Sequence, residues 1–175
     1  KQVGLLCMSY TTDSNDFLPP STDTTHWYQV LSGDASQRPS SLGFYFCPED
    51  PNSSVNVSGL GIIEGNFTLT NWAYGYISYG YNFLYLGPIN AQPTKLVRIK
   101  QTSKTLLAAE STPASQIGIK GQDYGYCKIL SWHDSVVAYP RHNRMGPEAG
   151  TCNVIFVDGH ATPIHTSTNM YDANV

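Results

Sequence analysis

The stretch Asn153-Val-Ile-Phe-Val-Asp-Gly-His160 decides the fold predicted for this chain. Its first residues include β-branched and aromatic side chains, which favour strands, and a second extended run continues from His160 to Ile164. An Asp-Gly pair between two such runs is the strongest short-range signal for a hairpin, because both central turn positions need a positive φ. We therefore predict a C-terminal β-hairpin with Asp158 and Gly159 as its structural turn.

The opposite end of the chain predicts a helix. Apolar residues recur there at helical spacing and form one stripe: Val3, Leu6, Cys7 and Tyr10. The pattern begins without an N-cap signal and is broken by the polar run Asp13–Asp16. Residues 1–12 are therefore typical of the C-terminal end of a longer helix.

Short elements are predicted between these ends. Trp27–Leu31 indicates a helical turn, and Lys95–Ile99 either a strand or a short helix. Short strands are predicted at Gly43–Pro48, Leu60–Ile63, Asn66–Thr70, Thr105–Glu110 and Val136–Tyr139. Glu110 ends an apolar run, and a solvated strand end is a simpler account of it than a buried acid. The fold class is α+β: one domain over residues 1–175, with a helix packed on a mainly antiparallel sheet with long loop excursions.

Composition limits the class of protein. The chain has 175 residues, enough for one domain with a core, and 41% of them are hydrophobic. No apolar run approaches the roughly 20 residues that a bilayer-spanning helix needs. Ten Lys and Arg face thirteen Asp and Glu without a basic tract, so nucleic acid is not an expected partner.

The four cysteines leave their redox state open. Cys7, Cys47, Cys127 and Cys152 contain no C-x-x-C pair, so a zinc-finger site is not predicted. One disulfide, such as Cys127 with Cys152, and four buried reduced thiols are equally compatible with the spacings.

Seven stretches resemble the bacterial prepilin-type proteins that carry a processing-associated His-x(9)-Asp-Gly domain. In chain order they are Lys1–Tyr10, Asp13–Pro19, Phe46–Pro48, Tyr79–Asn82, Lys104–Glu110, Arg141–His142 and Asn153–His160. The first two resemble that family's exit from the pilin helix, and Phe46-Cys47-Pro48 resembles its F-x-C-P strand end. The last two resemble its C-terminal signature. In this chain fifteen residues separate His142 from Asp158, and we interpret the extra six as a surface-loop insertion.

The resemblance implies a pilin-like fold and a structural role. The chain would be a non-enzymatic subunit of a type II secretion or type IV pilus-like assembly, with other pilin-like subunits as partners. A hydrophobic helix upstream of Lys1 would anchor it in the inner membrane and leave the folded domain in the periplasm or outside the cell. No cofactor is expected, apart from a bound metal ion considered next.

One metal hypothesis follows from residue types. His142, Asp158 and His160 could converge on a cation, because imidazole and carboxylate are normal ligands of first-row metals. The simpler interpretation is that they are hydrogen-bonded structural groups near a turn. A metal-dependent enzyme built on these three residues is the corresponding alternative to a structural subunit.

A second alternative is a secreted or surface carbohydrate-binding module. The segment 72–85 interleaves aromatic residues with glycine, and its candidate binding residues are Trp72, Tyr76, Tyr79 and Tyr81. Such rings can stack on sugars or contact a protein ligand, because tyrosine has a large apolar face and a polar tip. The simpler interpretation is that alternate rings fill the core of a strand-rich domain.

Overall fold

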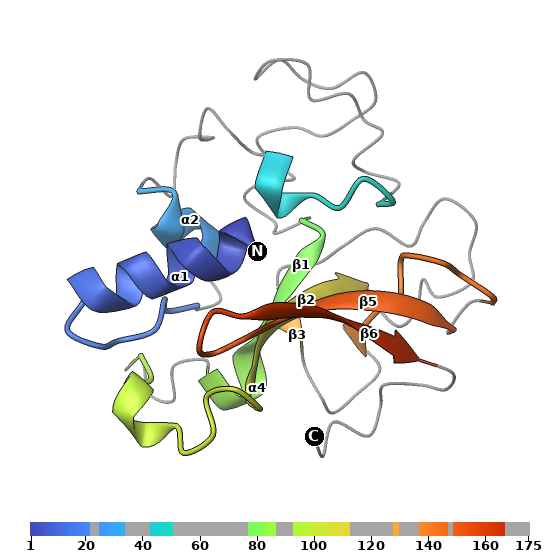
Figure 1. Ribbon diagram of the computed structural model, residues 1–175. Coiled ribbons are helices and arrows are strands. Elements are labelled where there is room, and N and C mark those ends of the chain that lie inside the picture. Colours follow the sequence, from blue (N-terminus) through green and yellow to red (C-terminus); the bar gives the residue numbers. More distant parts are fainter. Residues whose placement is uncertain are drawn as a thin grey trace.

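A computed structural model describes residues 1–21, 25–33, 43–50, 77–86, 93–112, 128–129, 137–146 and 149–166 (Figure 1). Its α-helices are α1 (Gln2–Asp13), α2 (Trp27–Leu31) and α4 (Phe83–Leu86), and its 3-10 turns are η1 (Gly43–Tyr45) and η2 (Leu96–Arg98). Its strands are β1 (Tyr79–Asn82), β2 (Leu106–Thr112), β3 (Lys128–Ile129), β4 (Val137–Ala138), β5 (Gly150–Phe156) and β6 (Ala161–Thr166). None of these helices is long and apolar enough to cross a membrane.

The described strands form one mainly antiparallel sheet. Its order is β3-β1-β2-β5-β6, and β4 pairs with the end of β2. The central register places Ala109 opposite Gly80 on β1 and Val154 on β5, whereas the short pairing of β1 with β3 is parallel. Together with α1 this sheet makes an α+β fold, as the sequence predicts.

Strands β5 and β6 are antiparallel neighbours joined by a short connection. Cys152 lies opposite Ile164, and the last pair is Ile155 with Ala161. The connection is longer than the expected two-residue turn, because the N–H of Phe156 donates to the carbonyl of His160 at 2.9 Å. Within this connection only Gly159 has a positive φ, 86°. A three-residue loop needs a left-handed conformation at one position, which explains why Asp158 does not adopt one.

Helix α1 packs closely against this connection, as Figure 1 shows. A Cβ on Gly4 would lie 2.8 Å from the carbonyl oxygen of Gly159, and a Cβ on Gly159 would lie 2.8 Å from Met8. Glycine is therefore required on both sides of the contact. The buried face of α1 includes Val3 and Cys7, which the expected stripe contained. The helix thus rests on the sheet at the turn end of β5 and β6.

The core between helices and sheet is rich in aromatic residues. Trp27 of α2 stacks on Tyr81 of β1 at 6.0 Å between ring centroids and meets Tyr45 edge-on at 5.9 Å. All three rings are fully buried, together with Leu107 of β2. This cluster explains why a five-residue helix is held in place, because packing rather than local propensity stabilises it.

One predicted strand is not observed. Gly43–Pro48 was expected as a strand, but its first residues form the 3-10 turn η1. Tyr45, Phe46 and Cys47 are all buried in succession, which a strand with alternating faces does not allow unless both faces are covered. Of the two options for Lys95–Ile99, the structure has the helical one, η2. The strands expected at 60–63 and 66–70 lie outside the described residues.

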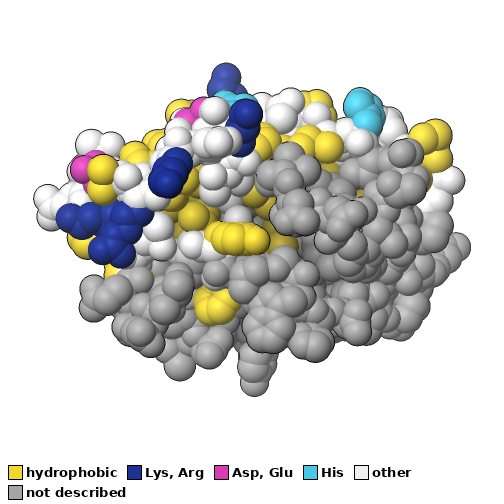
Figure 2. All heavy atoms as spheres, turned by 90° about the horizontal axis from the view of Figure 1, so that it is seen from below, with side chains coloured by type: hydrophobic (Ala, Val, Ile, Leu, Met, Phe, Trp, Pro, Cys, Tyr) yellow, Lys and Arg dark blue, Asp and Glu magenta, His cyan; other side chains and the backbone are white. Residues whose placement is uncertain are grey.

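Basic side chains gather toward one side of the face seen in Figure 2. Four of the ten Lys and Arg residues lie within ten positions around η2: Lys95, Arg98, Lys100 and Lys104. Lys95 lies over the ring of Phe17 at 4.7 Å, so part of this charge also serves packing.

Candidate functional site

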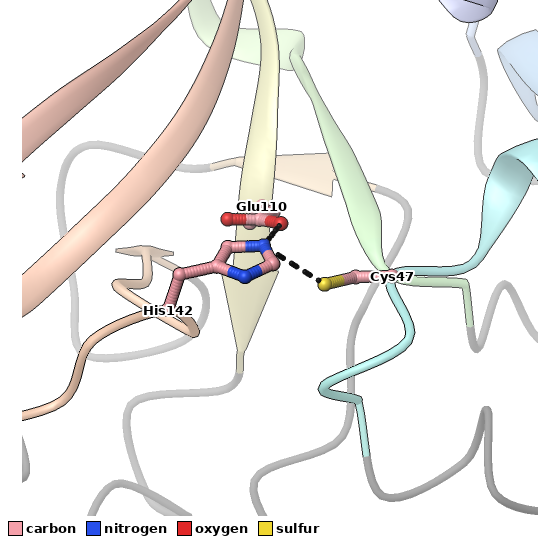
Figure 3. A group of neighbouring side chains, drawn as sticks. All are labelled: Cys47, Glu110 and His142. Carbon is pink, nitrogen blue, oxygen red and sulfur yellow. Dashed lines mark hydrogen bonds and ion pairs between the residues drawn. The ribbon is translucent and has the colours of Figure 1, made fainter.

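Three chemically active side chains meet at one point of the sheet. Cys47 follows η1, Glu110 lies on β2, and His142 comes from the segment before β5 (Figure 3). The Nε2 atom of His142 lies 2.8 Å from Oε1 of Glu110 and 3.2 Å from Sγ of Cys47. Their ligand-type atoms all lie within 4.8 Å of one another. We call this group the Cys47–Glu110–His142 cluster.

Glu110 is the centre of the cluster and is fully buried. The backbone N–H of Asn153 donates to its Oε2 at 2.8 Å, and the side-chain amide of Asn153 donates to its Oε1 at 3.1 Å. The expectation of a solvated strand end is therefore wrong. Strand β2 continues to Thr112, so Glu110 lies inside the sheet, where a carboxylate needs partners to offset its desolvation.

The backbone that carries His142 is fixed by β5. His142 and Thr151 form an isolated antiparallel bridge, in which the N–H of His142 donates to the carbonyl of Thr151 at 3.0 Å and the reverse bond is 2.6 Å. The imidazole is partly open to solvent, with 28% of its side chain exposed, whereas the Glu110 side chain is not exposed at all. The cluster therefore has a buried floor and one side that reaches water.

A second buried network holds Cys47. Its backbone N–H donates to Oγ of Ser78 at 2.7 Å, and that hydroxyl donates to Oδ2 of Asp50, also at 2.7 Å. Asp50 pairs in turn with Arg141 at 3.4 Å, and both side chains are almost completely buried. Arg141 also donates to the carbonyl of Ser111 on β2 at 2.6 Å. The backbone at Cys47 is thus linked through Ser78 and Asp50 to Arg141, the neighbour of His142, without any contribution from the cluster.

The Cys47 thiol is protonated at neutral pH. Burial, followed by the negative charge of Glu110 and the hydrogen bond to it, raises the pKa of Cys47 to about 12. Nucleophilic cysteines need a lowered pKa, because the thiolate is the reactive form. In a Cys–His relay, moreover, the acid binds the imidazole nitrogen that the thiol does not use. Here Cys47 and Glu110 share Nε2, so the geometry does not match a catalytic triad.

The cluster matches a metal-ligand set better than a relay. Thiolate, imidazole and carboxylate are the three ligand types that zinc takes from proteins, and sites with three protein ligands leave a fourth position open. A metal ion can bind here only if all three donor atoms point toward one common position, as they do in this cluster. The alternative is that the same three side chains form a hydrogen-bonded group that only stabilises the fold.

The structure does not bring together the three residues expected to bind a cation. His142 lies opposite Thr151 at the start of β5, whereas Asp158 and His160 follow the end of that strand. At about 3.3 Å per residue the two ends are roughly 20 Å apart. His160 instead pairs with Asp158, at 2.5 Å between Nδ1 and Oδ1, and its ring stacks on Phe156. Only His142 belongs to the observed cluster.

Of the four aromatic residues expected to bind a ligand, the structure describes two, Tyr79 and Tyr81. Tyr81 is fully buried in the core, so it offers no face to a sugar, and partly buried Tyr79 packs against the same core. Trp72 and Tyr76 lie outside the part of the chain that the structure describes. For the two described tyrosines, the core interpretation is the one observed.

The cysteines in the described segments are free thiols. Cys7, Cys47 and Cys152 are all buried, and Cys152 is a free thiol rather than a member of the disulfide considered from the sequence. Cys152 is close to the cluster, and its Sγ lies 3.7 Å from the carbonyl oxygen of Glu110. Cys127 itself is not among the described residues.

The sequence held a signal for the cluster that residue chemistry alone missed. Cys47, Glu110 and His142 each lie in a different one of the stretches that carry the prepilin-type resemblance. They are separated by 63 and 32 positions, so no spacing rule links them. Long-range contacts bring them together: Cys47 is hydrogen-bonded to Ser78 beside β1, and His142 is bridged to Thr151 of β5. Comparison of the chain with protein-family models, with curated proteins and with solved structures gave no match.

Proposed function

We propose that this chain is a pilin-like structural subunit of a type II secretion or type IV pilus-like assembly, with no chemistry on a substrate. The observation that carries the proposal is the seating of α1 on the antiparallel sheet through the Gly4–Gly159 contact. Because α1 is fixed to the sheet at this point, a membrane-anchoring extension of the helix would hold the folded domain in a defined position. The order of the seven resembling stretches supports the same class.

The chemistry of the described residues also favours a structural role. Cys47 is a buried thiol with a raised pKa, and the neighbouring Asp50 and Arg141 neutralise each other in a buried pair. Such networks commonly fix a fold rather than act on a substrate. Leu5, on the outer face of α1, is 59% exposed and offers an apolar contact for a neighbouring subunit.

The proposal is tested first on the gene and then on the expressed protein. It requires an apolar segment of about 20 residues upstream of Lys1, because that length spans a bilayer. The full-length protein should fractionate with membranes and become shorter when a prepilin peptidase is co-expressed. A reading frame without such a segment would overturn the proposal.

Assembly is tested by cross-linking in that full-length protein. Leu5→Cys should give disulfide-linked or bismaleimide-linked dimers, because it places a thiol on the exposed face of α1. Val97→Cys is the matched control, since Val97 is 82% exposed but lies on η2. Equal cross-linking at both positions would indicate random collision, and would argue against a neighbour docked on α1.

A further inference from the structure

We propose that the Cys47–Glu110–His142 cluster binds one zinc-type divalent cation. Its three donor atoms come from the segment after η1, from β2 and from the segment before β5, so a bound ion would join three parts of the fold. The inference goes beyond the proposed structural role and stands on different residues from α1.

The separations of the donor atoms fit a metal of this size. With metal–ligand distances of about 2.0–2.3 Å, tetrahedral geometry places neighbouring donors about 3.3–3.6 Å apart. The observed distances from Nε2 of His142, 2.8 Å to Glu110 and 3.2 Å to Cys47, are a few tenths of an ångström shorter. Small side-chain rotations would therefore make room for an ion without moving the strands.

The charges in the site also match a divalent cation. A Cys47 thiolate and the Glu110 carboxylate together carry two negative charges, and neutral His142 adds a nitrogen lone pair. A coordinated thiol loses its proton outright, so binding releases the Cys47 proton to solvent. The Asp50–Arg141 pair is already balanced and leaves this charge count unchanged.

The ligands are supported by the kind of outer contacts that metal sites use. The two Asn153 hydrogen bonds orient the Glu110 carboxylate, and the Ser78 hydroxyl fixes the backbone of Cys47. Such partners hold ligands in place and are worth about 10–100-fold in affinity in known sites. The fourth position of the tetrahedron would face the partly exposed side of His142, where water can enter.

The test uses the whole chain, reduced and stripped of metal with a chelator, and titrates it with Co²⁺ as a spectroscopic probe. Wild type should take up one equivalent, with a thiolate-to-cobalt charge-transfer band in the near ultraviolet and ligand-field bands in the visible. Zn²⁺ should displace the Co²⁺ and raise the melting temperature. Wild-type protein that shows no charge-transfer band at saturating Co²⁺ would overturn the proposal.

Cys47→Ser separates this site from other thiols. It should abolish the charge-transfer band and weaken Zn²⁺ binding by more than about 100-fold, because it removes a ligand rather than an outer partner. Cys152→Ser is the matched control, since Cys152 is also buried beside Glu110 but lies outside the cluster; it should keep the band. A band that survives in Cys47→Ser, or is lost in Cys152→Ser instead, contradicts the assignment.

X-ray absorption at the zinc edge keeps the test decisive if a variant does not fold. Zn²⁺-loaded wild type should fit one sulfur and several nitrogen or oxygen neighbours. A fit without sulfur, or with more than one, would show that the ion sits elsewhere.

Discussion

The two ends of β5 carry the same kind of residue pair in opposite surroundings. At its start His142 meets Glu110 at 2.8 Å, and beyond its end His160 meets Asp158 at 2.5 Å. The Glu110 side chain has no exposed area, whereas the Asp158 side chain is 34% exposed. Burial, rather than residue type, therefore makes one pair the centre of a site and the other part of a surface turn.

The partners of the two carboxylates follow from this difference. Glu110 accepts hydrogen bonds from both nitrogen donors of Asn153 as well as contacting His142, because a buried charge must be compensated within the protein. Asp158 accepts hydrogen bonds from the ring and the backbone N–H of His160, and its partly exposed side chain can also be solvated by water. The comparison predicts that the two ends respond very differently to mutation and pH.

The largest effect is expected from removing each carboxylate. Glu110→Ala should lower the free energy of unfolding by about 3–5 kcal/mol, because it leaves His142 and the Asn153 donors without their buried partner. Asp158→Ala should cost less than about 1 kcal/mol, as exposed pairs do. Urea unfolding of both variants measures the contrast. Similar losses at the two positions would mean that burial does not distinguish them.

The extent to which the sequence predicts this molecule differs between the same two regions. Local patterns placed α1, α2 and the extended runs on both sides of Asp158-Gly159 close to where the structure has helices and antiparallel strands. The cluster could not be predicted from such patterns, because its residues meet only through long-range contacts: Glu110 lies on β2, His142 is bridged to Thr151 of β5, and Cys47 is hydrogen-bonded to Ser78 just before β1. The predicted grouping of His142 with Asp158 and His160 was wrong. These residues are near one another in sequence, but strand β5 runs between them and places them at opposite ends. All three cluster residues lie in stretches that carry the family resemblance, but these stretches did not indicate that the residues are close in space.

The next effect tests the backbone of the exposed turn. Gly159→Ala should lower stability by about 1–2 kcal/mol for a non-glycine residue at positive φ, and further because its Cβ would press on Met8. Gly33→Ala is the matched control: Gly33 also has a positive φ, 75°, but a Cβ there would meet no atom of the described residues within 4 Å beyond its chain neighbours. Thermal or urea unfolding should therefore show a larger loss for Gly159→Ala. Equal losses in the two variants would show that the close contact between Gly159 and α1 contributes nothing to stability.

Alkaline pH should act on two buried thiols, Cys47 at the buried end of β5 and Cys7 on the buried face of α1. Burial raises the pKa of Cys7 to about 12, and burial with the charge of Glu110 raises that of Cys47 to the same value. Above the ordinary thiol pKa, 9.0, the unfolded chain loses these protons while the folded chain keeps them. Stability is therefore complete below pH 9 and falls as the pH rises toward 12, by at most about 1.4 kcal/mol per pH unit for each thiol. Urea unfolding of the chelator-treated, metal-free protein at rising pH measures the slope, which Cys47→Ser should reduce; an unchanged slope would contradict a Cys47 that is buried and protonated in the absence of metal.

The smallest effect is expected from acid at the exposed end. Slight desolvation would raise the pKa of Asp158, but hydrogen bonds from the ring and backbone of His160 outweigh it and hold the pKa below its usual value. The pair therefore adds stability above the ordinary carboxyl pKa and loses it as the pH falls through the lowered one, a change of less than about 0.5 kcal/mol for so exposed a pair. A carboxyl-carbon NMR titration should show the Asp158 pKa rising in His160→Ala, where the ring bond is lost but the backbone bond remains. A pKa that does not move would place the shift in the backbone of the turn, and would leave the exposed His160–Asp158 pair with no electrostatic role comparable to that of His142 and Glu110.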